Sequence, residues 1–140
     1  MKVVDEYIVL RLLDPQWESS LLDERLVLPY SRHWRLLSAL GAPSRSQGQL
    51  SQRLQSLSSD AVDFIRRPHP DVLHVPDPRD HILLAAELLN VTGASSLMFA
   101  ETLAACIAFE SDFHCGAPRN AIGQLAERAA AIDVVIRIED

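Results

Sequence analysis

The first thirteen residues, MKVVDEYIVLRLL, constrain the fold most, because a strand pattern passes into a helical pattern with no loop between them. Residues 2–5 form a short β-branched run that is typical of a buried strand. Apolar residues at helical spacing then predict a helix over residues 6–13, and Asp14-Pro15 ends it. Parallel α/β sheets are built from such strand-to-helix units.

The rest of the chain alternates between the same two patterns. Beyond the first helix, we expect strands over residues 72–75, 112–115 and 132–138, the last of a buried type. Helices are expected within the stretch 26–40 after Ser31 as N-cap, around Leu50 to Leu57, over 61–65, from Arg79 to Gly93, over 97–109 after Ser95 or Ser96, and over 116–131 with Pro118 near the start. This order predicts one α/β domain, residues 1–140, with three layers and a central, mostly parallel sheet flanked by helices.

Composition narrows the class of protein. The 140 residues are 48% hydrophobic and 23% charged, which is typical of a soluble globular protein. Cys106 and Cys115 are the only cysteines, and both lie in apolar stretches, so a reducing cytoplasmic setting and no membrane are expected. The net charge of -6 argues against general nucleic-acid binding, although local arginine clusters leave room for an RNA contact.

Two carboxylates lie in apolar surroundings. Asp5 closes the first predicted strand, and Glu101 sits in a helix that is apolar on every face. Ligand crevices of open parallel sheets lie beyond the carboxyl ends of the strands, so Asp5 is expected there. If Glu101 reaches the same crevice, the two charges need a proton, an arginine or a divalent cation between them. The residues alone leave two interpretations open: a magnesium or manganese site, or carboxylates bonded to the backbone or to arginines.

Several stretches, in their order along the chain, resemble those of PIN domains, including the VapC-type toxins. They are MKVVDEYIVLRLL, VLHVPDPRDHILLAAELL, AETLAACIAF and DFHCGAPRNAIGQLAERAAAIDVVI. PIN domains are ribonucleases in which acidic side chains hold magnesium or manganese and a metal-bound water attacks the phosphodiester. The resemblance implies that Asp5 matches the first acid and Glu101 the third, as catalytic residues and metal ligands.

The same resemblance implies that half of the acidic site is missing. Arg35 stands where the second acid is expected, and the segment HCGAPRN offers no fourth acid. Arg35 is therefore expected to pair with Asp5 or Glu101 in place of an ion. Asp112 and Glu6 are spare acids, but Asp112 begins a strand at the wrong end of the sheet, and Glu6 is expected to point elsewhere.

Other residues are weaker candidates. His114, beside Cys115, lies where the missing acid should be, but a His-Cys nucleophilic pair would lack an orienting group. The turn CGAPRN, with Arg119, is expected to line the site, and its backbone N–H groups suit a phosphate. The segment YSRHWR suits single-stranded RNA, but an ordinary amphipathic helix with Trp34 inward and Arg32 outward is favoured.

Two functions follow as hypotheses. The first is a PIN-like protein with an incomplete acidic site, acting as a non-catalytic or weakly active module that binds protein or RNA. The alternative is a magnesium- or manganese-dependent endoribonuclease of the toxin–antitoxin type that uses Asp5 and Glu101. An antitoxin-like protein and a homodimer are the expected protein partners, with the dimer formed through the helices around Leu50 to Ile65 or the region of Trp17.

Overall fold

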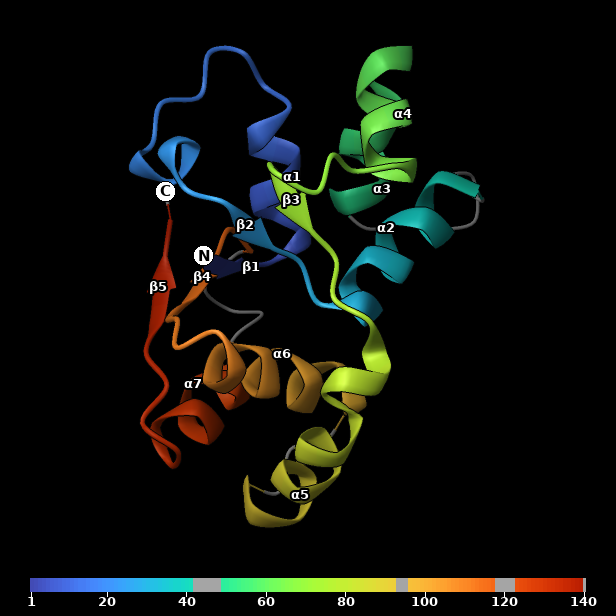
Figure 1. Cartoon of the computed structure of the whole chain (residues 1–140). Coiled ribbons are helices and arrows are strands. Elements are labelled where there is room, and N and C mark those ends of the chain that lie inside the picture. Colours follow the sequence, from blue (N-terminus) through green and yellow to red (C-terminus); the bar gives the residue numbers. More distant parts are fainter. Residues whose placement is uncertain (42–48, 93–95, 118–122, 140) are drawn as a thin grey trace.

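The central element is a sheet of five short strands. The computed structural model describes residues 1–41, 49–92, 96–117 and 123–139 (Figure 1). The strands lie in the order β3-β2-β1-β4-β5, and every neighbouring pair is parallel, which confirms the predicted parallel α/β class. Their bounds are β1 Lys2–Val4, β2 Leu26–Val27, β3 Leu73–His74, β4 Phe113–Cys115 and β5 Ile136–Ile138.

Helices cover both faces of this sheet, which gives the three expected layers (Figure 1). On one side lie α1 Glu6–Leu12, α2 Tyr30–Gly41, α3 Gln49–Gln55 and α4 Ser59–Arg66. On the other side lie α5 Ile82–Thr92, α6 Leu97–Ala108 and α7 Gly123–Ala130. In the described part of the chain, the 3-10 turns η1 Ser20–Asp23 and η3 Pro78–Asp80 lie between these elements.

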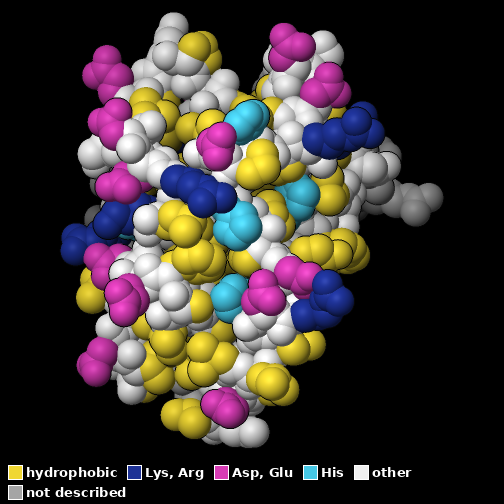
Figure 2. Space-filling model, in the orientation of Figure 1, with side chains coloured by type: hydrophobic (Ala, Val, Ile, Leu, Met, Phe, Trp, Pro, Cys, Tyr) yellow, Lys and Arg dark blue, Asp and Glu magenta, His cyan; other side chains and the backbone are white. Residues whose placement is uncertain are grey.

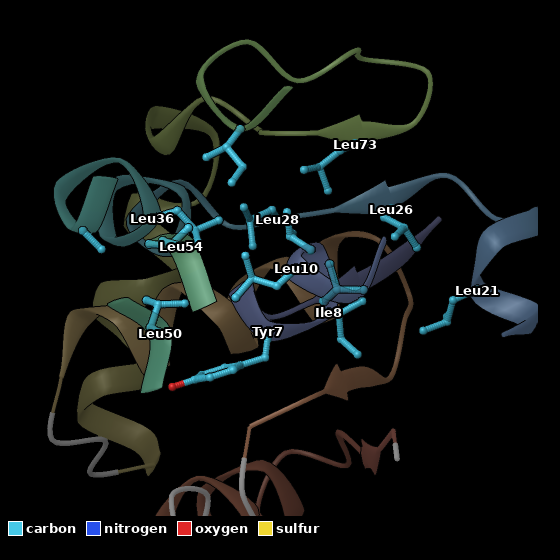
Figure 3. Close-up of a cluster of buried hydrophobic side chains, with 14 residues drawn as sticks. Tyr7, Ile8, Leu10, Leu21, Leu26, Leu28, Leu36, Leu50, Leu54 and Leu73 are labelled. Carbon is cyan, nitrogen blue, oxygen red and sulfur yellow. The ribbon is translucent and has the colours of Figure 1, made fainter. Parts of the chain in front are cut away.

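Each face of β1 packs into a separate hydrophobic core. Successive residues of a strand point to opposite faces, and Val3 joins the core under α5, α6 and α7, whereas Val4 joins the core under α1 to α4. Figure 3 shows this second core, to which α1 contributes Ile8 and Leu10 and α2 contributes Leu36. Burial on both faces explains why the first strand is β-branched and wholly apolar at these two positions.

The predicted strands over 2–5, 72–75, 112–115 and 132–138 correspond to β1, β3, β4 and β5. β2 is not among the predicted strands; its two residues precede Pro29, in the stretch before the expected N-cap Ser31. The prediction that β5 is buried was wrong: Ile136 and Ile138 are half-buried and Arg137 is exposed, because β5 is an edge strand.

The predicted helices are present, but some of them start at other residues than expected. α5 begins at Ile82, after the 3-10 turn η3, and not at Arg79. Residues 116 and 117, the expected start of the last helix, are not helical.

A further difference is at the start of α2. That helix begins at Tyr30, so Ser31 lies inside its first turn and does not cap it. Ser96 caps α6 by accepting a hydrogen bond from the Phe99 N–H, as one of the two predicted caps. The predicted roles of Gly93 and Pro118 fall outside the described residues.

α5 and α6 carry an exposed apolar surface. α6 is buried from Ala100 to Cys106, as its all-round apolar pattern predicts, and α5 packs against it. The outward face of α5 exposes Ile82, Leu83 and Val91 to solvent. Figure 2 shows hydrophobic side chains gathered over this end of the molecule. Within the described residues, no helix combines the length and apolar character needed to cross a bilayer.

Candidate functional site

The carboxyl ends of β1 and β4 form a crevice at the centre of the sheet. The chain runs from β1 to β2 and β3 on one side and returns to β4 and β5 on the other, so the strand order reverses between β1 and β4. Such reversal points are where open α/β sheets bind ligands. We call the pocket of about 190 Å³ at this point the strand-end crevice; it is lined by Asp5, Glu6, Tyr7, Arg32, Arg35, Met98, Phe99, Phe113, Cys115, Ala117 and Leu125.

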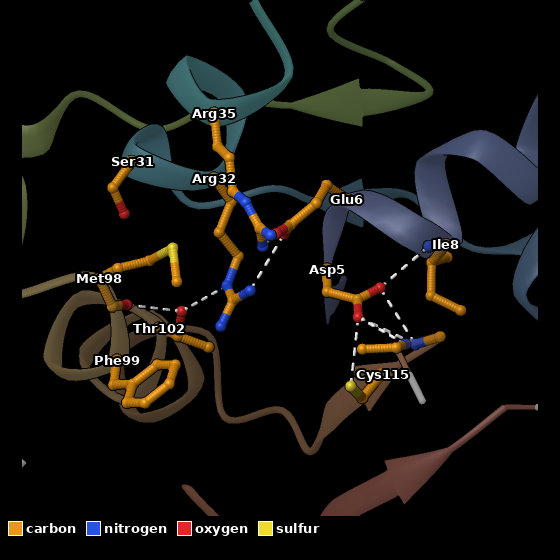
Figure 4. Close-up of polar contacts among 12 residues, drawn as sticks. Asp5, Glu6, Ile8, Ser31, Arg32, Arg35, Met98, Phe99, Thr102 and Cys115 are labelled. Atoms are coloured by element: carbon orange, nitrogen blue, oxygen red, sulfur yellow. Dashed lines mark hydrogen bonds and ion pairs between the residues drawn. The ribbon is translucent and has the colours of Figure 1, made fainter. Parts of the chain in front are cut away.

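Asp5 lies at the crevice as predicted, but its carboxylate is bonded to the protein itself (Figure 4). Oδ1 accepts hydrogen bonds from the backbone N–H groups of Ile8, which makes Asp5 the N-cap of α1, and of Gly116. Oδ2 accepts from the N–H groups of Gly116 and Ala117, at 3.0 Å each, and from the Cys115 thiol at 3.2 Å. A carboxylate has about four acceptor positions, so these donors leave Asp5 none for a metal ion.

The turn after β4 therefore supplies hydrogen-bond donors to the Asp5 carboxylate. Its Gly116 and Ala117 N–H groups, predicted to face a phosphate, point at this carboxylate instead. Gly116 is required for the close approach, because a Cβ there would lie 3.1 Å from the Tyr7 Cβ and 3.2 Å from the Ile8 backbone nitrogen. Contacts of that length push against backbone atoms, which cannot move aside without disturbing the cap of α1.

Glu6 is the second carboxylate of the crevice, and the expectation that it points elsewhere was wrong. Its side chain has no exposed surface, and it forms ion pairs with Arg32 at 3.0 Å and Arg35 at 2.5 Å. Burial alone would raise the pKa of Glu6, but the two guanidinium groups hold that pKa below its ordinary value. Glu6 is thus a buried, charged group with both of its oxygens paired.

Arg32 links the two sides of the sheet. Its Nε donates to the Thr102 hydroxyl of α6 at 2.7 Å, and its guanidinium lies 5.0 Å from the centre of the Phe113 ring of β4. Burial would lower the pKa of Arg32, but the carboxylates of Glu6 and Asp5 raise it above its ordinary value. Figure 4 shows this guanidinium between Glu6 and Thr102.

The orientation of α2 reverses the sequence prediction. Arg32 is 5% exposed and points inward with Leu36 and Ala39, whereas Trp34 is 62% exposed. The buried face therefore follows the spacing i, i+4, i+7 from Arg32, and the predicted inward position of Trp34 was wrong. The partners that bury Arg32 come from distant parts of the chain, so the pattern of α2 alone does not reveal them.

Arg35 does not replace a metal ion between the two predicted acids. It pairs with Glu6, and no hydrogen bond or ion pair joins it to Asp5 or Glu101 in the described part of the chain. The prediction identified an arginine at the crevice but assigned it the wrong carboxylate. Because Arg32 and Arg35 are three residues apart on one helix, their spacing was the signal that both reach the same partner.

Glu101 lies in a different pocket. This pocket, of about 400 Å³, is lined by Tyr30, Ser31, Trp34, Pro78, Ile82, Ala85, Leu97 and Glu101, and we call it the Trp34 groove. Glu101 Oε1 accepts hydrogen bonds from the Ser31 N–H at 2.9 Å and from the Ser31 hydroxyl at 3.3 Å. Asp5 and Glu101 thus line separate pockets, each bonded to different partners.

Asp112 and His114 each have a partner within the protein. Asp112 precedes β4 at the amino end of the sheet, as predicted, and pairs with Arg137 of β5. His114 Nδ1 lies 2.7 Å from Glu139 Oε1. His114 and Cys115 are adjacent in a strand and so face opposite sides of the sheet. Arg119 lies outside the described residues.

The Cys115 thiol is unreactive in this environment. Burial, together with the neighbouring Asp5 carboxylate, raises the pKa of the Cys115 thiol to about 12. A thiol with such a pKa is not a nucleophile near neutral pH. The raised pKa therefore gives no support to a nucleophilic pair of His114 and Cys115.

The charges of the strand-end crevice balance. Asp5 and Glu6 supply two negative charges, and Arg32 and Arg35 supply two positive ones. Across the residues that the structure describes, no three His, Cys, Asp or Glu side chains come together in a way that would hold a metal ion. The carboxylates present do not fit an oxygen-liganded magnesium or manganese site, which needs unshared carboxylate oxygens.

Comparison with known proteins adds no assignment of family. No protein-family model matches the chain, and a search of curated proteins finds no match.

Proposed function

We propose that this chain is a non-catalytic domain that binds a protein partner through a PIN-like fold. One observation carries the proposal: both carboxylates of the strand-end crevice are bonded to donors within the chain. Asp5 accepts from four groups, and Glu6 pairs with two arginines. A magnesium or manganese ion would have to displace these donors before it could activate a water.

The charges of α2 favour a protein partner over RNA. RNA contacts depend on arginine and lysine side chains that are free to meet phosphates. Arg32 is buried and Arg35 is paired with Glu6, so the arginines of YSRHWR are already neutralised. The side chains left exposed nearby are apolar or aromatic, among them Trp34, Ile82 and Leu83. Exposed apolar surface of this kind is typical of protein contact sites.

A metal titration tests the proposal that the domain is not catalytic. We expect millimolar MnCl₂ to leave the melting temperature of the chain unchanged, and we expect no manganese-dependent cleavage of a structured RNA. The proposal is overturned if MnCl₂ raises the melting temperature of the wild-type chain and of Asp112→Asn but not that of Asp5→Asn or Glu101→Gln. Asp112 is the matched control because its carboxylate is paired at the opposite end of β4. RNA cleavage that needs manganese and stops with EDTA overturns the proposal without any variant.

A binding assay tests the choice of partner. Fluorescence anisotropy of a labelled single-stranded RNA and a labelled hairpin, at low salt, is expected to show no saturable binding. Saturable binding to the wild-type chain that falls as salt rises contradicts the preference for a protein partner.

A further inference from the structure

The Trp34 groove is lined by a mostly buried carboxylate, Glu101, which is bonded to the protein through one oxygen. Glu101 is 8% exposed, and its Oε1 is held by Ser31. Among the described residues, no hydrogen bond or ion pair reaches its other oxygen, Oε2. Among the described residues that line the groove, Glu101 is the only charged one, in contrast to the balanced strand-end crevice. Its second carboxylate oxygen can accept a charge-assisted hydrogen bond from a cation outside the chain.

The walls of the groove suit an organic cation. Tyr30 and Trp34 are four residues apart on α2, so their side chains lie side by side on one face of the helix. The faces of such rings attract ammonium and guanidinium groups. The opposite wall is apolar, with Ile82 of α5 and Leu97 of α6, and Figure 1 shows these helices meeting the start of α2.

The size of the groove suits a small molecule. Its volume of about 400 Å³ falls within the range of small-ligand sites, which are mostly apolar with a few polar groups that fix orientation. Here Glu101 would be the orienting group, and its position is set by the two bonds to Ser31. Two anchoring bonds on one oxygen leave the other oxygen free to receive a donor.

We propose that the Trp34 groove binds a small organic cation, a primary ammonium on an aromatic or branched aliphatic body. The ammonium donates to Glu101 Oε2 and lies against the Trp34 or Tyr30 ring, and the apolar body contacts Ile82 and Leu97. This site is separate from the strand-end crevice and does not depend on whether the domain is catalytic.

Tryptophan fluorescence tests this site directly. The chain has two tryptophans, so Trp17→Phe leaves Trp34 as the only reporter. The probe is 2-phenylethylamine hydrochloride at neutral pH, and the matched neutral probe is 2-phenylethanol, which has the same body. We expect a saturable change with the amine and binding about tenfold weaker with the alcohol, the difference expected from a charge-assisted hydrogen bond. Equal affinity for the two probes, or no saturable signal with the amine, overturns the proposal without altering the groove.

A charge-removing variant then assigns the effect to Glu101. In the Trp17→Phe background, Glu101→Gln keeps an oxygen that accepts from Ser31 and is expected to weaken amine binding about tenfold while leaving the alcohol unaffected. Glu87→Gln is the matched control, because it removes the same charge from the exposed side of α5, outside the groove. Amine affinity that falls equally in both variants shows a general charge effect and contradicts a site at Glu101.

Discussion

The ion pairs of Glu6 make a quantitative prediction, because its two arginine partners differ in burial. The side chains of Glu6 and Arg32 are 0% and 6% exposed, whereas that of Arg35 is 46% exposed. Removing one partner of a buried pair leaves an uncompensated charge and costs about 3–5 kcal/mol. Removing a solvent-screened partner costs less than about 1 kcal/mol. We therefore expect Glu6→Gln and Arg32→Met to destabilise the fold severely and Arg35→Met to have little effect.

Urea unfolding at neutral pH, followed by circular dichroism, measures these differences. With a slope of about 2 kcal/mol per molar urea, a loss of 3–5 kcal/mol lowers the midpoint by about 1.5–2.5 M. The corresponding shift for Arg35→Met is below about 0.5 M. Small domains have a free energy of unfolding of about 5–15 kcal/mol. If the wild-type chain lies in the upper part of that range, Glu6→Gln and Arg32→Met should still fold in the absence of urea.

A double variant provides the control. Glu6→Leu combined with Arg32→Met removes both buried charges, and its stability should return to within about 1 kcal/mol of wild type or exceed it. Two results refute the reasoning: an Arg35→Met midpoint as low as that of Arg32→Met, or a Glu6→Gln shift below about 0.5 M. The first result would mean that the exposed Arg35 stabilises the Glu6 carboxylate as much as Arg32 does. The second would mean that the Glu6 charge needs neither arginine.

Three further predictions concern pH, thiol reactivity and backbone packing. The pKa of Glu6 lies lower in the folded chain than its ordinary value of 4.5, so the ion pairs of Glu6 stabilise the fold at pH values above 4.5. This stabilisation is lost as the pH falls through the folded-state pKa. Glu6→Gln should therefore flatten the fall in melting temperature below about pH 5. Burial is the main cause that raises the pKa of both Cys106 and Cys115 to about 12, so mass spectrometry should find neither thiol alkylated by iodoacetamide at about pH 8 until urea is added, and rapid labelling of the native chain would contradict this. Gly116→Ala should cost about 1–3 kcal/mol in urea unfolding, since its Cβ would press on the backbone of α1, whereas Gly41→Ala, with no atom within 4 Å of the new Cβ, should cost nothing measurable.

Local patterns in the sequence predicted most elements of the fold. Periods of two and 3.6 residues, with capping residues and prolines, indicate strands and helices because they reflect which side of a short segment is buried. They located β1, β3, β4 and β5 and placed Asp5 at the carboxyl end of the first strand. They missed β2, because two residues display no period; β3 is as short, but the prolines on both sides of it marked its position.

The candidate site was only partly predictable. A buried carboxylate at Asp5 and an arginine at the crevice were expected, but their partners were not. Three of the four donors to Asp5 come from residues 115–117, more than a hundred positions along the chain. Which donor meets which acceptor depends on how β1 and β4 pair, and no local pattern encodes that register.

The sequence by itself determined an α/β chain in which a buried strand ends in an acid and apolar helices follow. Only the tertiary structure decided that Glu6 takes the two arginines, that Asp5 is saturated by the turn after β4, and that Glu101 faces a separate groove. The physical reason is clearest in α2. A tryptophan is normally the more favourable residue to bury, but the distant partners Glu6 and Thr102 satisfy Arg32 inside the fold and leave Trp34 at the surface.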